Sequence, residues 1–197
     1  MSQAAVSVRR ARVTDASMLA ELGARLFLET YEHETPAADM ASFLEQMHGL
    51  EQQTRELSST DIATFIAEAA GTAIGYTQVR IKSVPDGTSV GARVELWRLY
   101  VDRRWHGLGV ADQLLAQALD AVRAFGETMV WLSVWEQNPR AIAYYRKRGF
   151  ELAGSHDFRV AASSYRDFVM VRRLPAGWPA SSADRSTLAM SPDHSGR

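Results

Sequence analysis

Residues 99–111 read LYVDRRWHGLGVA, an apolar strand that runs into a loop with two glycines and then directly into a helix. Gly107 and Gly109 allow close approach of the backbone and unusual dihedral angles. The start of the following helix offers N–H groups without intrahelical partners, at the positive end of the helix dipole. Two arginines and His106 add positive charge beside it. The segment therefore predicts an anion-binding turn between a strand and a helix.

This pattern alone has a second interpretation, an ordinary strand-to-helix turn. The loop is not a P-loop, because GxxxxGK[ST] is absent from the sequence. It is not a Rossmann fingerprint either, because the third glycine and the early βαβ position are missing. A choice between an anion site and a plain turn requires a second motif.

The spacing of apolar residues predicts the elements around this segment. Helices are expected over residues 16–31, from residue 36 onward, and over 50–57, 110–125 and 138–149. Strands are expected over 7–12, 62–69, 72–82, 93–101, 130–134, 150–155 and 167–173. This order implies an α+β domain with a mixed, mostly antiparallel sheet flanked by helices.

The length of 197 residues fits one domain with a tail. We interpret residues 1–175 as a single domain, because apolar periodicity continues through them. Residues 176–197 are rich in Ser, Ala, Pro and Gly and show no periodicity, so we expect a flexible C-terminal tail there.

Composition restricts the class of protein. The chain has 22 Lys+Arg and 23 Asp+Glu, a net charge of −1, which argues against a nucleic-acid-binding protein. Cysteine is absent and the five histidines show no ligand spacing, so we expect no disulfide and no metal. No apolar run approaches about 18 residues, and residues 1–8 lack a signal-peptide core. We therefore expect a cytoplasmic protein without a membrane partner.

A second motif lies after the first, where residues 131–138 read WLSVWEQN and residues 141–150 read AIAYYRKRGF. Asn138 is a good helix N-cap and Gly149 a good C-cap. Both predicted helices begin just past the ends of neighbouring strands. A long cofactor could lie between those strands and use their exposed backbone groups as an added strand would.

Together the two motifs resemble those of the GCN5-related N-acetyltransferases (the GNAT family), which bind acetyl-CoA. The pyrophosphate loop of that family, [QR]-x-x-G-x-[GA], matches residues 106–111 except that His106 replaces Gln or Arg. The second signature of the family is met by Asn138, Ala141, Ile142, Tyr145, Gly149 and Phe150. The resemblance covers roughly residues 6–174. Segments within 27–31, 95–101, 106–109, 131–136 and 154–158 are most similar to the PaiA-type spermidine/spermine acetyltransferases.

The resemblance implies acetyl-CoA as cosubstrate. The implied contacts of acetyl-CoA are Leu99, Tyr100, Val101, His106, Gly107, Leu108, Gly109, Val110, Ala111, Asn138 and Tyr145. The backbone N–H of Val101 would polarise the thioester carbonyl, and residues 106–111 would hold the pyrophosphate. A small-molecule amine would be the other substrate, and relatives often form homodimers.

The resemblance also assigns roles in catalysis. Tyr145 matches the general acid of the family, although an aromatic residue at helical spacing is also typical of packing. Glu95 lies where relatives place a carboxylate that relays a proton from the amine through water. Strand alternation puts Glu95 on one face with Trp97, Leu99 and Val101, so it is either inward and functional or at a solvated edge.

Three further residues are candidates for the acceptor site. His156 could contact the substrate or act as an alternative base, or it could be a surface histidine at a strand end. Phe27 and Tyr31 lie one helical turn apart and could form a wall of the site.

The function expected from these features is acetyl transfer from acetyl-CoA to a primary amine, with a small polyamine-like acceptor. Two alternatives stay open: a peptide or protein N-acetyltransferase, and a CoA-binding regulatory module without turnover.

Overall fold

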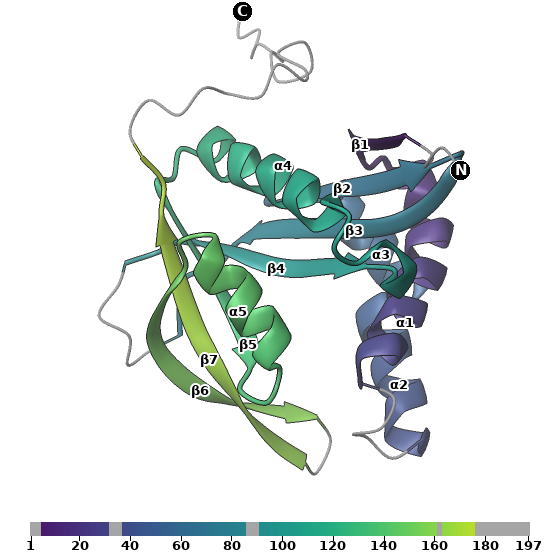
Figure 1. Cartoon of the computed structure of the whole chain (residues 1–197). Helices are drawn as coiled ribbons and strands as arrows, with labels where there is room; N and C mark the ends of the chain where they lie inside the picture. Colours follow the sequence, from purple (N-terminus) through teal and green to yellow (C-terminus); the bar gives the residue numbers. More distant parts are fainter. Residues whose placement is uncertain (1–4, 32–36, 86–90, 161–162, 176–197) are drawn as a thin grey trace, which may run out of the picture.

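The fold is a seven-stranded sheet with helices on both faces (Figure 1), seen in a computed structural model that describes residues 5–31, 37–85, 91–160 and 163–175. The strand order is β1-β2-β3-β4-β5-β7-β6. The strands are β1 (Val6–Arg10), β2 (Ile62–Ala69), β3 (Thr72–Ile81), β4 (Val94–Val101), β5 (Met129–Trp135), β6 (Glu151–Val160) and β7 (Ser163–Arg173). Neighbouring strands are antiparallel except β4 and β5, which confirms the predicted mixed, mostly antiparallel α+β architecture.

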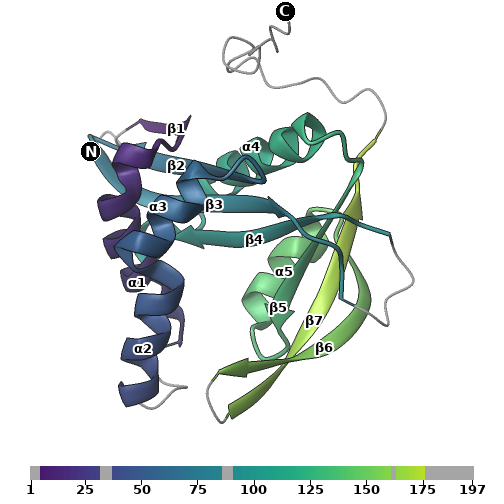
Figure 2. The ribbon, with the colours of Figure 1, turned by 180° about the vertical axis from the view of Figure 1, so that it is seen from behind.

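The helices cover the two faces of the sheet in separate groups. They are α1 (Ala16–Tyr31), α2 (Ala37–His48), α3 (Leu50–Ser58), α4 (Val110–Ala124) and α5 (Pro139–Lys147), with short 3₁₀ turns η1 (Val13–Asp15) and η2 (Arg103–Trp105). Helices α4 and α5 lie on one face, whereas α1, α2 and α3 lie on the other, as the reverse view in Figure 2 shows. Most predicted elements agree with the structure to within about two residues, but the last two strands are longer than expected. The predicted tail, residues 176–197, lies outside the described residues.

Strands β4 and β5 separate soon after they meet. They share one parallel register pair, Glu95 with Trp131. Sheet hydrogen bonding joins β4 to β3 on its other side along its length. The two strands therefore diverge in the middle of the sheet, and the side of β4 that faces β5 is open beyond Glu95.

A β-bulge in β4 corrects one prediction from the sequence. Gln78 of β3 opposes Arg98, whereas the next residue, Val79, opposes Leu96, so Trp97 is an extra residue in the ladder. An extra residue reverses the inward and outward alternation that follows it. Glu95 consequently does not share a face with Leu99 and Val101, which pack with Leu96 against the core under α4. The expected common face was wrong because simple alternation assumes a strand without a bulge.

A buried ion pair anchors this part of β4 to the helices behind the sheet. Arg98 Nη1 donates to Glu56 Oε2 at 2.6 Å and to Gln78 Oε1 at 2.5 Å. Its Nη2 donates to the carbonyl of Met47 at 2.7 Å. The side chains of Arg98 and Glu56 are only 3% and 2% exposed, so both charges depend on their protein partners. These contacts join α2 and α3 to β3 and β4.

Replacement of Glu56 by Gln is expected to lower the free energy of unfolding by about 3–5 kcal/mol, because it leaves the Arg98 charge buried without its counter-ion. Glu51→Gln on the same helix is the matched control. It removes an exposed pair with Arg55, worth less than about 1 kcal/mol. Urea unfolding of both variants checks this prediction, and equal losses would contradict it.

Candidate active site

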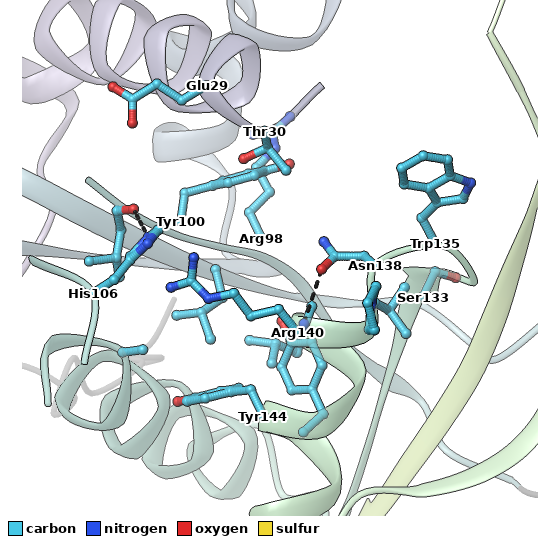
Figure 3. A pocket seen from close by; sticks show the side chains of 18 of the residues that line it. Glu29, Thr30, Arg98, Tyr100, His106, Ser133, Trp135, Asn138, Arg140 and Tyr144 are labelled. Atoms are coloured by element: carbon cyan, nitrogen blue, oxygen red, sulfur yellow. Dashed lines mark hydrogen bonds between the residues drawn. The ribbon is translucent and has the colours of Figure 1, made fainter. Parts of the chain in front are cut away.

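A cavity of about 470 Å³ lies in the gap between β4 and β5. Figure 3 shows its lining side chains, which come from β4, β5, α5, α1 and the glycine loop. The main lining segments are Leu96–Val101, Ser133–Trp135 and Asn138–Ala141, joined by Glu29, Thr30, Arg103, His106, Ala111, Tyr144 and Tyr145. The cavity thus lies where the two sequence motifs meet.

The open side of β4 supplies backbone groups to this cavity. The carbonyl of Val101 accepts a hydrogen bond from Nε2 of His106 at 2.8 Å, so it points away from β3. The N–H and C=O of one residue point to the same side of an extended strand. The N–H of Val101 therefore also faces the gap, where an extended ligand can accept from it.

The glycine loop forms an open turn at the start of α4. Gly107 and Gly109 have φ of 79° and 80°, the left-handed region that favours glycine. A Cβ built on either residue would have no heavy atom within 4 Å, so the space above the turn is free. The first N–H groups of α4 have no intrahelical partners. Arg103 and Arg140 at the cavity wall add positive charge, so the structure has the features of the predicted anion site.

The residues of this loop differ in their surroundings. His106 and Ala111 line the cavity. Val110 is fully buried in the core, and Leu108 is 46% exposed. Any contact of Val110 with a bound anion would therefore come from its backbone N–H group, whereas the N–H of Leu108 donates to the carbonyl of Trp105 at 3.4 Å.

Tyr145 lies at the cavity with its ring packed against aromatic neighbours. Its ring centroid is 5.4 Å from that of Tyr144 and 5.5 Å from that of Phe150. Burial, and secondarily the nearby Tyr100, raises the pKa of Tyr145 well above its ordinary value of about 10. Burial also raises the pKa of Tyr100 to about 12. The phenol of Tyr145 therefore keeps its proton at neutral pH and can donate it in the cavity.

Asn138 begins α5, as the sequence predicted. Its Oδ1 accepts a hydrogen bond from the N–H of Ala141 at 3.0 Å, and Pro139 occupies the first helical position. The same side chain lines the cavity. Capping and ligand contact are therefore compatible at this position.

Glu95 is buried outside the cavity lining and is held by cations. Its Oε2 accepts from Arg80 Nε at 2.6 Å and lies 3.7 Å from Lys82 Nζ. The Arg80 guanidinium also stacks on the Trp97 ring, 3.6 Å from the centroid. The carboxylate is therefore paired on the face opposite the core under α4, and its role as a base stays a prediction.

The remaining candidates from the sequence are dispersed. Phe27 packs between α1 and α2, with ring centroids 5.1 Å from Phe43 and 5.6 Å from His48. Helix α1 presents Glu29 and Thr30 to the cavity instead. The side chain of Tyr31 lies outside the described residues. His156 does not line the cavity. Its Nε2 lies 2.6 Å from Oγ of Ser133, and Ser133 does line the cavity.

Sequence reasoning did not identify several cavity residues, among them Ser133, Trp135 and Arg140. Alternation along β5 is the signal that could have located Ser133 and Trp135, since every second residue faces the same side. No helix within the described ranges has the length and apolarity needed to cross a membrane. Nor does the described part of the chain gather three or more His, Cys, Asp or Glu side chains suited to a metal ion.

Known proteins resemble this chain both in sequence and in fold. Residues 23–150 match the acetyltransferase (GNAT) family. An uncharacterized N-acetyltransferase of Mycobacterium tuberculosis is 32% identical over 162 residues, which are 82% of this chain and 99% of that protein. A Bacillus subtilis spermine/spermidine N(1)-acetyltransferase is 27% identical over 45% of this chain and 59% of its own length.

A solved structure shares the fold. PaiA N-acetyltransferase from Thermoplasma acidophilum, crystallised in complex with coenzyme A, superposes with a TM-score of 0.69 at 22% sequence identity. The match covers 86% of this chain and 99% of that one. The family match and the Mycobacterium relative together establish that this chain belongs to the GNAT family of N-acetyltransferases.

Proposed function

We propose that this protein transfers an acetyl group from acetyl-CoA to the primary amine of a small acceptor. The observation that carries this proposal is the cavity between β4 and β5, which combines an open strand edge, a free glycine turn and a protonated tyrosine. Acetyl-CoA, when bound, supplies an acetyl group activated as a thioester. A solved structural neighbour contains coenzyme A, which supports this choice of cosubstrate.

The geometry of the chain suits a long anionic ligand. The free space over Gly107 and Gly109 lets phosphate oxygens approach the N–H groups at the start of α4. His106 fixes the end of β4 through the Val101 carbonyl, although it replaces the Gln or Arg of the family pattern. The open edge of β4 can pair with an extended amide-containing arm, and the Val101 N–H can donate to a carbonyl oxygen there.

Tyr145 is the proposed general acid. Departure of a thiolate is easier when a positioned donor protonates the sulfur. With an ordinary pKa of about 10 that burial raises further, the Tyr145 phenol is in the donor form throughout the neutral range. The aromatic contacts with Tyr144 and Phe150 hold its ring in the cavity.

A polyamine-like acceptor is supported by the name of one similar protein, the Bacillus spermine/spermidine N(1)-acetyltransferase, and by the sequence segments that resemble the PaiA-type acetyltransferases. The first test is release of CoA thiol from acetyl-CoA with spermidine, spermine, amino acids and short peptides. Turnover on polyamines supports the proposal, and turnover on peptides alone assigns the acceptor to the peptide class. Binding of acetyl-CoA without turnover on any amine would indicate a regulatory module instead.

Tyr145→Phe is expected to lower kcat by about 100-fold or more and to leave the affinity for acetyl-CoA nearly unchanged, because only the proton donor is lost. Steady-state kinetics and calorimetric titration with acetyl-CoA measure the two quantities. Tyr144→Phe is the control, since it removes a hydroxyl that donates to Asp112 at 3.1 Å, and its kcat should change far less. An unchanged kcat in Tyr145→Phe would exclude the acid role.

Gly109→Trp is expected to abolish acetyl-CoA binding, because the indole would fill the free space at the start of α4. Gly126→Trp is a matched control at the other end of the same helix. That glycine has φ of 79° and equally free space, so the backbone strain of about 1–2 kcal/mol is the same. Calorimetry should show binding in Gly126→Trp and none in Gly109→Trp. Binding by both folded variants would place the phosphate site elsewhere.

A further inference from the structure

We propose that Ser133, His156 and Asp167 form the acceptor side of the active site, where His156 takes the ammonium proton of the substrate through the Ser133 hydroxyl. The proposal rests on the proposed function, since it assigns the base for the same transfer. A protonated amine has a pKa of about 10 and cannot attack a thioester until it loses a proton. The cavity therefore needs a proton acceptor near the amine.

Ser133 connects the cavity to His156. Its side chain lines the cavity from β5, and its Oγ lies 2.6 Å from Nε2 of His156 on β6. The imidazole itself is not among the lining groups, so the serine hydroxyl is the contact through which a proton can reach it. A short hydrogen bond of this kind is the arrangement in which a hydroxyl and an imidazole exchange a proton.

The strand register brings the third residue of the group beside the histidine. Strand β7 lies between β5 and β6, and Asp167 of β7 opposes both Trp135 of β5 and His156 of β6. Ser133 is two residues from Trp135 and so faces the same side of the sheet. That face is the one opposite α5, because the intervening Val134 packs in the core below α4 and α5. Three strands thus place a hydroxyl, an imidazole and a carboxylate together.

The charges around His156 suit a proton acceptor. Asp167 is half-buried, and burial together with the nearby Glu136 raises its pKa to about 6, against the lowering effect of His156. Above that pH the ionised carboxylate stabilises an imidazolium on the neighbouring strand. The adjacent cation on β7, Arg166, donates to Ser155 Oγ at 3.1 Å.

Glu95 is a less suitable acceptor for the same proton. Its carboxylate is paired with Arg80 and Lys82 and lies outside the cavity lining. The contacts with both cations hold this carboxylate away from an amine in the cavity.

The proton transfer balances in three steps. The ammonium N–H bond breaks as its proton passes to Ser133 Oγ, while the serine proton passes to Nε2 of neutral His156, which carries its other proton on Nδ1. The free amine attacks the thioester carbonyl and forms the C–N bond. The C–S bond then breaks, Tyr145 protonates the leaving sulfur, and the second proton of the attacking nitrogen restores the phenol. One proton remains on His156 and returns to solvent.

The test is the pH dependence of kcat/KM in His156→Gln with the amine that the wild-type enzyme acetylates best. The wild type should reach a plateau near neutral pH. The variant should fall by about 100-fold or more at pH 7. Its kcat/KM should then rise about tenfold per pH unit toward the pKa of the amine, because only substrate that is already neutral can react. Recovery at high pH is a signature that misfolding does not produce, and the affinity for acetyl-CoA should be unchanged.

Two serine variants locate the route of the proton. Ser133→Ala should show the same rising profile as His156→Gln. Ser155→Ala changes an exposed neighbour whose hydroxyl accepts from Arg166, and this variant should keep the wild-type plateau. A wild-type profile in Ser133→Ala would overturn the route through this hydroxyl.

The outcomes separate this inference from the proposed function. If the wild type is active and the kcat/KM plateau persists in His156→Gln, this inference is wrong and the proposed function stands. The same holds if Glu95→Gln loses the plateau while His156→Gln keeps it. A wild type that releases no CoA thiol with any amine contradicts the proposed function and this inference with it.

Discussion

The separation of β4 from β5 is the constraint on which the site depends. Two parallel strands that share one register pair leave backbone groups in the middle of the sheet without strand partners. Such groups are costly to bury unless a ligand or solvent satisfies them. The bulge at Trp97 and the buried pair of Arg98 with Glu56 hold β4 in this position. The open edge is therefore built into the fold and does not depend on a mobile loop.

Burial raises the pKa of one group in the cavity and of one group near it. It is the largest influence on the pKa of Tyr145, which rises, and on the pKa of Asp167, which rises to about 6. Burial thus acts on a phenol that lines the cavity and on a carboxylate of β7 that lies outside the lining. In the proposed mechanism these two groups serve the leaving thiolate and the attacking amine respectively. Their separation onto α5 and the β6–β7 hairpin keeps acid and base apart.

Ion pairing distinguishes the buried carboxylates from one another. Glu56 and Glu95 each face an arginine at 2.6 Å and are committed to holding β3, β4 and α3 together. Asp167 instead lies opposite His156 in the register of β6 and β7. Sequence alone favours Glu95 as the base that takes the amine proton, because Glu95 lies on the strand that leads into the glycine loop. The pairing of Glu95 with Arg80 depends on the register of β3 and β4, which the sequence alone does not give.

The order of the elements, the glycine turn before α4, the Asn138 cap and the family motif with Tyr145 could be predicted from the sequence, because these depend on periodicity, capping and local spacing along the chain. The sequence could not predict the bulge at Trp97, since a bulge is a property of two paired strands. Nor could it place Ser133 beside His156 or Asp167, because these residues meet only through the β5-β7-β6 register. Strand pairing therefore sets which polar groups reach the cavity, because it brings together residues that are far apart in the sequence.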